Sequence, residues 1–127
     1  MRKLLLSILA LALLLPVPGA FADEDDLVVQ VFNKTNELRI VSVTIESASG
    51  GGGGYKKLEG GTEAYFDHSR KDDYQMWMFS ITDENLNEIA QIDLSYSNGL
   101  FFPGVISGSG SVSFSMDGQH PFLDINK

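Results

Sequence analysis

The sequence predicts an all-β protein: a single antiparallel β-sandwich of about seven or eight short strands, following a cleaved N-terminal signal peptide. Three observations predict this fold. Segments rich in Val, Ile, Phe and Tyr recur between residues 27 and 125. Polar turns separate them at intervals of about 8–12 residues. After residue 22, no segment combines an apolar period of about 3.6 residues with a helix cap.

The first residues read as a secretory signal. Arg2 and Lys3 precede the apolar run "LLLSILALALLL" at 4–15, and "AFA" at 20–22 has the small-residue spacing that signal peptidase recognises. The run is shorter than the roughly twenty residues needed to span a bilayer. We therefore expect cleavage after Ala22, which gives a signal peptide at 1–22 and one β-sandwich domain at 23–127.

Composition indicates the cellular location of the protein and the partners it excludes. The chain has no cysteine, and a small exported domain without disulfides is more typical of bacteria than of eukaryotes. We expect a periplasmic or secreted protein. Removal of Arg2 and Lys3 from the 9 basic residues leaves 7 against 17 acidic ones, a formal charge of −10. Such a chain is repelled by nucleic acid and anionic lipid, so we expect no nucleic-acid partner and no charge-driven membrane contact.

The first strands are predicted at 27–32 and 38–47, joined by a turn at 33–37. In the second, Val41, Val43 and Ile45 share one face while polar side chains share the other, as expected for a strand that is buried on one side. The turn contains the glycosylation sequon Asn33-Lys34-Thr35. We interpret it as a turn in which Asn33 and Thr35 bond to local backbone.

The 27–47 segment resembles the small lipid-binding or haemolysin-type sandwiches such as the aegerolysins. The likeness covers only this hairpin and includes no diagnostic motif, so it implies no site or activity for this chain.

Further strands follow at 62–68, 74–82 and 88–97. The second of these is the most apolar and has Trp77, Phe79 and Ile81 on one face, which predicts a central strand. Asn98-Gly99 is a tight-turn dipeptide. The last hairpin is predicted at 111–116 and 119–125 around Asp117-Gly118, and Pro121 suggests that its second strand lies at an edge.

The glycine run at 50–54 allows three interpretations. It lacks the Gly-Lys-Ser/Thr ending of a phosphate-binding P-loop, and its flanks are too short for an interdomain linker. We therefore interpret it as a long mobile loop that a partner could order.

The sequence contains no convincing catalytic or metal motif. Asp83-Glu84-Asn85 begins like a calcium loop, but Glu88 stands where glycine is required and Leu94 where glutamate is required. His68 and His120 are the only histidines and are far apart in sequence. We predict no enzyme activity, no cofactor and no metal. A small secreted hydrolase, which would need His68 or His120, is the weakest alternative.

Aromatic residues carry the functional prediction. Tyr65 and Phe66 are adjacent, so one faces away from the core, and "LFFP" at 100–103 is apolar where we expect a loop. Exposed aromatics mark contacts with proteins, sugars or lipids. We predict an exported, non-enzymatic binding module of the bacterial envelope or medium, with Tyr55, Tyr65, Phe101 and Phe102 touching a protein or glycan. The alternative is a membrane-active, haemolysin-like sandwich that inserts Phe101 and Phe102 into a neutral membrane.

Overall fold

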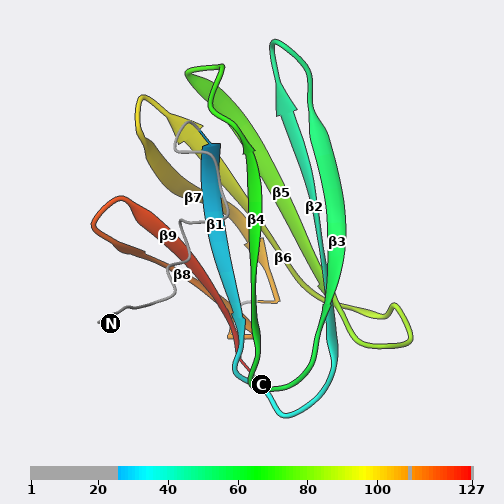
Figure 1. The fold of residues 1–127 in the computed structure, drawn as a ribbon. Coiled ribbons are helices and arrows are strands. Elements are labelled where there is room, and N and C mark those ends of the chain that lie inside the picture. The colour runs from blue at the N-terminus through cyan, green and yellow to red at the C-terminus, as the bar shows by residue number, and fades with distance from the viewer. Residues whose placement is uncertain (1–25, 109, 127) are drawn as a thin grey trace, which may run out of the picture.

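The computed structural model describes residues 26–108 and 110–126; the predicted signal peptide at 1–22 lies outside them. The described residues form nine strands and no helix (Figure 1). The strands are β1 (Asp26–Asn33), β2 (Arg39–Ser47), β3 (Gly52–Leu58), β4 (Glu63–Ser69), β5 (Tyr74–Thr82), β6 (Glu88–Ser97), β7 (Leu100–Ser107), β8 (Val112–Asp117) and β9 (His120–Ile125).

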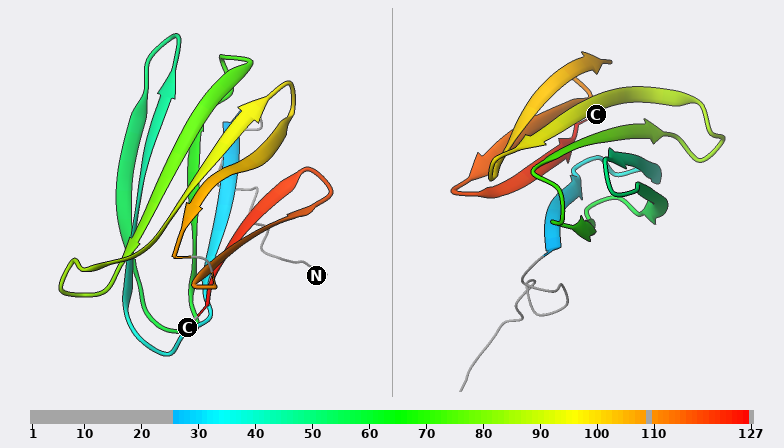
Figure 2. Two further views of the ribbon diagram at one scale, coloured as in Figure 1. Left: turned by 180° about the vertical axis from the view of Figure 1, so that it is seen from behind. Right: turned by 90° about the horizontal axis from the view of Figure 1, so that it is seen from above.

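Two sheets pack face to face, as Figure 2 shows from two further directions. One has five strands in the order β3-β2-β5-β6-β7, and the other has four in the order β4-β1-β9-β8. All neighbours are antiparallel except β1 and β9, which pair in parallel. The predicted β-sandwich is confirmed, with nine strands among the described residues where about seven or eight were expected. Residues 100–103, expected as a loop, are part of β7, because the turn at Asn98-Gly99 returns the chain along β6. β3 and β7 are unpaired edges of the larger sheet, and β4 and β8 are those of the smaller one.

The core forms where the inward faces of the two sheets meet. Along β5 every second side chain is buried, and Trp77, Phe79 and Ile81 are almost fully covered. The same alternation in β2 buries Val41, Val43 and Ile45, as expected from the sequence. In β6 it buries Ala90, Ile92, Leu94 and Tyr96. Burial of apolar surface is the main stabilising term in such a sandwich. The buried core comprises Leu27, Val29, Val31, Val41, Val43, Ile45, Leu58, Phe66, Trp77, Phe79, Ile81, Ala90, Ile92, Leu94, Tyr96, Phe101, Val112, Leu123 and Ile125.

The glycine run differs from the prediction. Gly52 to Gly54 belong to β3 and pair with Ile45, Thr44 and Val43 of β2, so this part of the run is strand and not loop. The strand has no pattern of apolar residues, and its register comes from β2. Glycine also allows close approach, since a Cβ atom on Gly53 would lie 2.8 Å from the Val43 carbonyl oxygen.

Pro121 also differs from its expected place. β9 lies between β1 and β8 and is an interior strand. The proline is tolerated because it stands near the beginning of β9, and pairing with β1 starts only at the next residue, Phe122. A missing amide hydrogen therefore interrupts no bond to β1.

Asn33 joins the two sheets at one end of the sandwich. Its buried side chain donates hydrogen bonds to the carbonyl oxygens of Glu37 at 2.9 Å, Leu58 at 3.0 Å and Glu59 at 3.3 Å. Its Oδ1 atom accepts from the Thr35 hydroxyl at 2.7 Å. The interpretation of the sequon as a turn is confirmed, and the side-chain amide is not accessible in the folded protein. These bonds hold the turns β1–β2 and β3–β4 together.

Candidate functional site

The four aromatic residues singled out by the sequence lie in different environments. Phe101 is buried, with its ring 5.4 Å from that of Trp77 and 5.1 Å from that of Tyr96. Phe102, the next residue on β7, points outward and is 48% exposed. Phe101 is therefore a core residue. Tyr55 and Tyr65 come from the two edge strands β3 and β4, and the fold brings them to the rim of one hollow.

This hollow lies between the unpaired edges of the two sheets, and we call it the edge groove. Its walls are residues 52–56 of β3 and residues 65–68 of β4, and the core side chains Val43 and Ile45 line its base. Its volume is about 400 Å³. Pockets of about 300–1,000 Å³ with an apolar base and a few polar groups are typical ligand sites.

The groove exists because the inward positions of β3 carry little side-chain volume. Gly54 pairs with the buried Val43 and so faces inward, but a Cβ atom added there would meet nothing within 4 Å. Gly52 also faces inward, and its Cβ would lie 3.0 Å from the His68 ring. Contact between β3 and the His68 ring therefore restricts the groove at Gly52, while the space above Gly54 stays open.

Polar groups surround this apolar base. The Lys56 ammonium lies 5.8 Å from the centre of the Phe66 ring, a cation–π distance. The Tyr65 hydroxyl donates to Glu63 Oε2 at 3.3 Å. Partial burial, assisted by the Glu63 charge and this hydrogen bond, raises the pKa of Tyr65, so its hydroxyl is a protonated donor at neutral pH. Lys56 is the polar side chain that faces this base, whereas Tyr65 and Asp67 lie on the outer face of β4 at the margin of the groove.

A second feature is an apolar patch on the outer face of the larger sheet, formed by Tyr74, Met76, Leu100 and Phe102. Leu100 and Tyr74 both pair with Ser97, and Phe102 and Met76 both pair with Ser95. The small serines leave the larger side chains standing above the sheet. Tyr74, Leu100 and Phe102 are 55%, 43% and 48% exposed.

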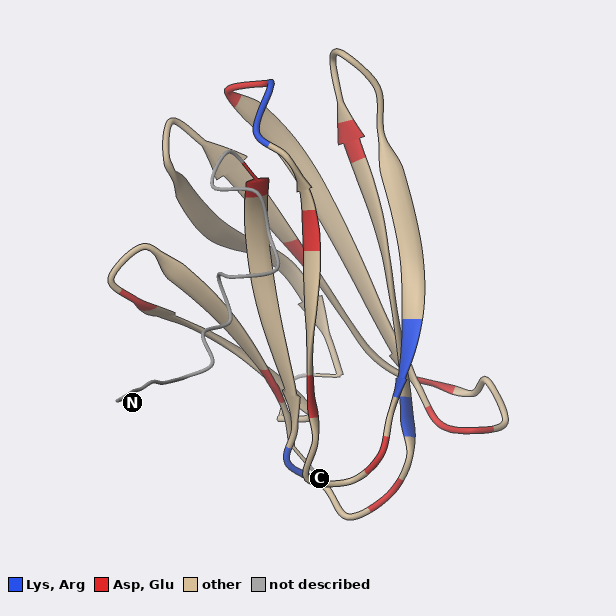
Figure 3. Cartoon of the chain, in the orientation of Figure 1, with Lys and Arg blue, Asp and Glu red and all other residues tan. Residues whose placement is uncertain are grey.

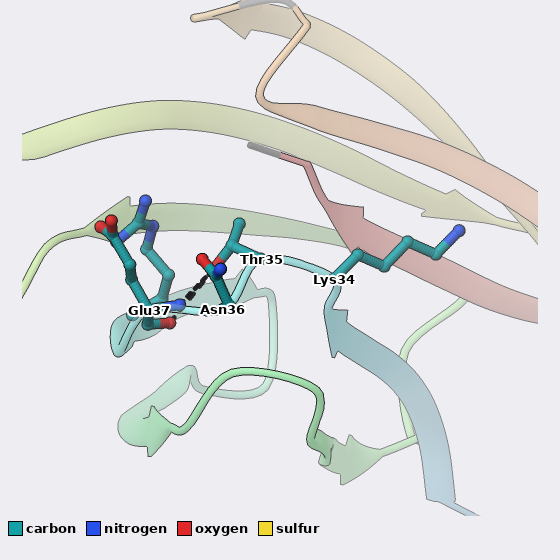
Figure 4. Close-up of a pocket in the computed structure, with 5 residues that line it drawn as sticks. Lys34, Thr35, Asn36 and Glu37 are labelled. Atoms are coloured by element: carbon teal, nitrogen blue, oxygen red, sulfur yellow. Dashed lines mark hydrogen bonds and ion pairs between the residues drawn. The ribbon is translucent and has the colours of Figure 1, made fainter.

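The hollow beside the β1–β2 turn, formed by Lys34, Thr35, Asn36, Glu37 and Arg39, is a weaker candidate (Figure 4). Lys34 extends away from the other labelled side chains and pairs with Asp124 at 3.2 Å. Arg39 bonds to Glu37 at 3.4 Å, although its Nε atom is buried without a partner among the described residues. The carboxylates of Glu37 and Asp83 flank the guanidinium, so the hollow does not favour an anion.

The two histidines do not meet. His68 faces inward from β4 with its ring 6.4 Å from that of Trp77. The His120 Nε2 atom lies 2.9 Å from Gln30 Oε1, and Gln30 pairs with Tyr65 on the outer face of the smaller sheet. Within residues 26–108 and 110–126, no three His, Cys, Asp or Glu side chains are grouped as metal ligands.

The Asp83 turn is held by its own hydrogen bonds. The Asp83 carboxylate accepts from the backbone amides of Asn85 and Asn87, both at 2.9 Å. The bond from the Asn87 amide is the main cause that lowers the pKa of Asp83. These bonds make the segment a polar turn between β5 and β6.

The described part of the chain includes no helix long and apolar enough to cross a membrane. No protein-family model matches the sequence, and comparison with curated proteins finds no significant match. The site must therefore be argued from its own residues. Sequence reasoning found Tyr55 and Tyr65 but missed Gly54, Lys56 and Asp67. The sequence signal that could have revealed the groove is "GGGYKKL". If this segment is taken as a strand, Gly52 and Gly54 fall on its inward face and leave that half of the face without side chains.

Proposed function

We propose that the protein is an exported, non-enzymatic binding module of the bacterial envelope or medium, which holds an extended polypeptide segment along the edge groove. The observation that carries this proposal is the open space above Gly54 between two unpaired sheet edges. An unpaired strand presents backbone N–H and C=O groups in a regular row, and a second strand can satisfy them.

The side chains of the groove set the preferences of that segment. A side chain with an apolar stem facing Gly54 would cover Val43 and Ile45, which line the base of the groove. Lys56, which faces inward, and the unpaired backbone groups of β3 would bind its polar atoms. The excess of acidic residues, which Figure 3 shows spread over both sheets, favours a bound segment that itself carries basic residues.

The test uses the protein with a cleavable C-terminal tag, produced in its own host, to capture partners from periplasm and medium. Three baits are compared: wild type, Gly54→Val and Gly104→Val. Valine at 54 occupies the open space, whereas Gly104 is a matched glycine on the opposite edge, where a Cβ would lie 3.5 Å from the Asp93 carbonyl oxygen. A protein identified by mass spectrometry with wild type and Gly104→Val, and lost with Gly54→Val, would support the proposal. Equal capture by all three baits would contradict it.

The apolar patch supports a second candidate, contact with a neutral lipid membrane. Phe102 and Leu100 are exposed and adjacent to Tyr74 and Met76 across small serines. Because Phe101 is buried, its substitution would damage the core and would not report on lipid contact. The variant Leu100→Ser/Phe102→Ser should lose binding to phosphatidylcholine vesicles at low and high salt alike, with Tyr55→Ser as the control. If the wild-type protein does not bind phosphatidylcholine vesicles, this candidate function is excluded.

A further inference from the structure

Three of the four sheet edges carry features that discourage pairing with another chain. β7 contains Pro103 and a break in its pairing with β6. β4 has the outward acids Glu63 and Asp67. β8 has only 6 residues. Proline, irregular pairing, charge and shortness are the usual protections of an edge.

The remaining edge, β3, carries lysines at 56 and 57, but they lie in one half of the strand and glycines fill the other half, so the strand is complementary to itself. If two β3 strands run antiparallel with Tyr55 opposite Tyr55, the glycines face large side chains: Gly54 faces Lys56, Gly53 faces Lys57 and Gly52 faces Leu58. All 7 residues of the strand are then paired. Directly opposed side chains lie about 5 Å apart on the same face. The Lys56 chain of the second copy would therefore enter the space above Gly54.

The charges select this register over its neighbours. Figure 3 shows that the basic residues of β3 lie in one half of the strand, at Lys56 and Lys57. If one β3 strand is shifted by two residues relative to the other, in either direction, fewer residues of β3 are paired. In one of the two directions the shift also sets Lys56 opposite Lys56. A shift of one residue turns the two core faces to opposite sides. In the Tyr55-centred register no lysines are opposed, and the Lys56 side chain of the second copy comes to the open space above Gly54.

We propose that the segment held in the edge groove is β3 of a second copy of this chain, so that the two five-stranded sheets join across a two-fold axis at Tyr55. Each copy contributes a lysine to the groove of the other. This proposal rests on the proposed function, because it names the partner of the same edge.

Disulfide trapping tests both the contact and its register, since the chain has no cysteine of its own. In the Tyr55-centred register residue 55 meets itself, whereas residues 54 and 56 meet only each other. Tyr55→Cys should form a disulfide-linked dimer in a glutathione buffer. Gly54→Cys and Lys56→Cys should cross-link when mixed and remain largely monomeric alone. Phe102→Cys, exposed on the β7 edge, is the matched control.

Sedimentation equilibrium measures the dimer without cross-linking. Tyr55→Lys places two ammonium groups opposite each other at an exposed position, so we expect the dissociation constant of the dimer to rise about tenfold or more while the melting temperature stays near that of wild type. A monomeric wild type at high concentration, or trapping equal to that of Phe102→Cys, would overturn the proposal. The proposed function fails separately. If the wild type is monomeric but captures a partner protein that Gly54→Val does not capture, only the dimer proposal is wrong. If all three baits capture equally and no disulfide trapping occurs, both proposals are wrong.

Discussion

Substitution of Asn33 by alanine should destabilise the protein strongly. The side-chain amide donates to the carbonyl oxygens of Glu37 and Leu58 at 2.9 and 3.0 Å, and Oδ1 accepts from Thr35 at 2.7 Å. At about 1 kcal/mol for each of these three contacts, the loss is about 3 kcal/mol. This is a large fraction of the roughly 5–15 kcal/mol that holds a domain together.

Thermal denaturation followed by circular dichroism would measure the effect. With about 4–8 °C per kcal/mol for a domain of this size, we expect the melting temperature to fall by about 12–24 °C. Asn36→Ala is the control, because Asn36 is exposed in the same turn. Asn33→Asp keeps the shape but sets a carboxylate beside carbonyl oxygens, and should cost at least as much as alanine. If Asn33→Ala and Asn36→Ala melt together, the assigned role of Asn33 in joining the turns is wrong.

Further substitutions test other features. Gln75→Leu should cost about 2 kcal/mol in urea denaturation, because buried Gln75 accepts from Trp77 Nε1 at 2.9 Å and donates to the Ser69 carbonyl at 2.7 Å; a neutral result would refute this. Gly54→Val should be neutral or stabilising while Gly53→Val destabilises, since only the second Cβ meets backbone, at 2.8 Å. Leu86→Gly should stabilise by about 1 kcal/mol, because Leu86 has a φ of 68°; unchanged stability would contradict the strain. Folding lowers the pKa of Asp83 below its ordinary 3.8, so its stabilisation is present above that pH and is lost as pH falls through the folded value. The stability difference between wild type and Asp83→Ala should therefore shrink in acid urea titrations.

The strands with alternating or β-branched residues were predictable. Those at 74–82 and 88–97 are observed with the expected ends, because each combines a buried face with a polar turn at both limits. Asn98 and Gly99 both have positive φ, as a tight hairpin turn requires, and this turn sets Tyr96 opposite Phe101. Extension of that hairpin would have shown from the sequence that Phe101 is buried and Phe102 exposed.

β3 and the edge groove were not predictable by the same reasoning. Glycine has no side chain to reveal which face is buried, so Gly52 to Gly54 carry no period. β3 forms because the backbone groups along one side of β2 are available to pair with it. The convergence of Tyr55 and Tyr65 depends on which strands end the two sheets, and strand order is a property of the whole chain. His68 and His120 illustrate the same limit, since they occupy opposite faces of one sheet.

The parallel pairing of β1 with β9 has a consequence for how the protein folds. Val31 lies beside Leu123, so the first and last strands of the domain complete the smaller sheet together. No N-terminal fragment can build that sheet, and contacts this distant in sequence make folding slow. Completion of the smaller sheet must wait until β9 is available. For a protein that carries a predicted export signal, this delay would keep the chain threadable through a translocation channel until its last strand has passed.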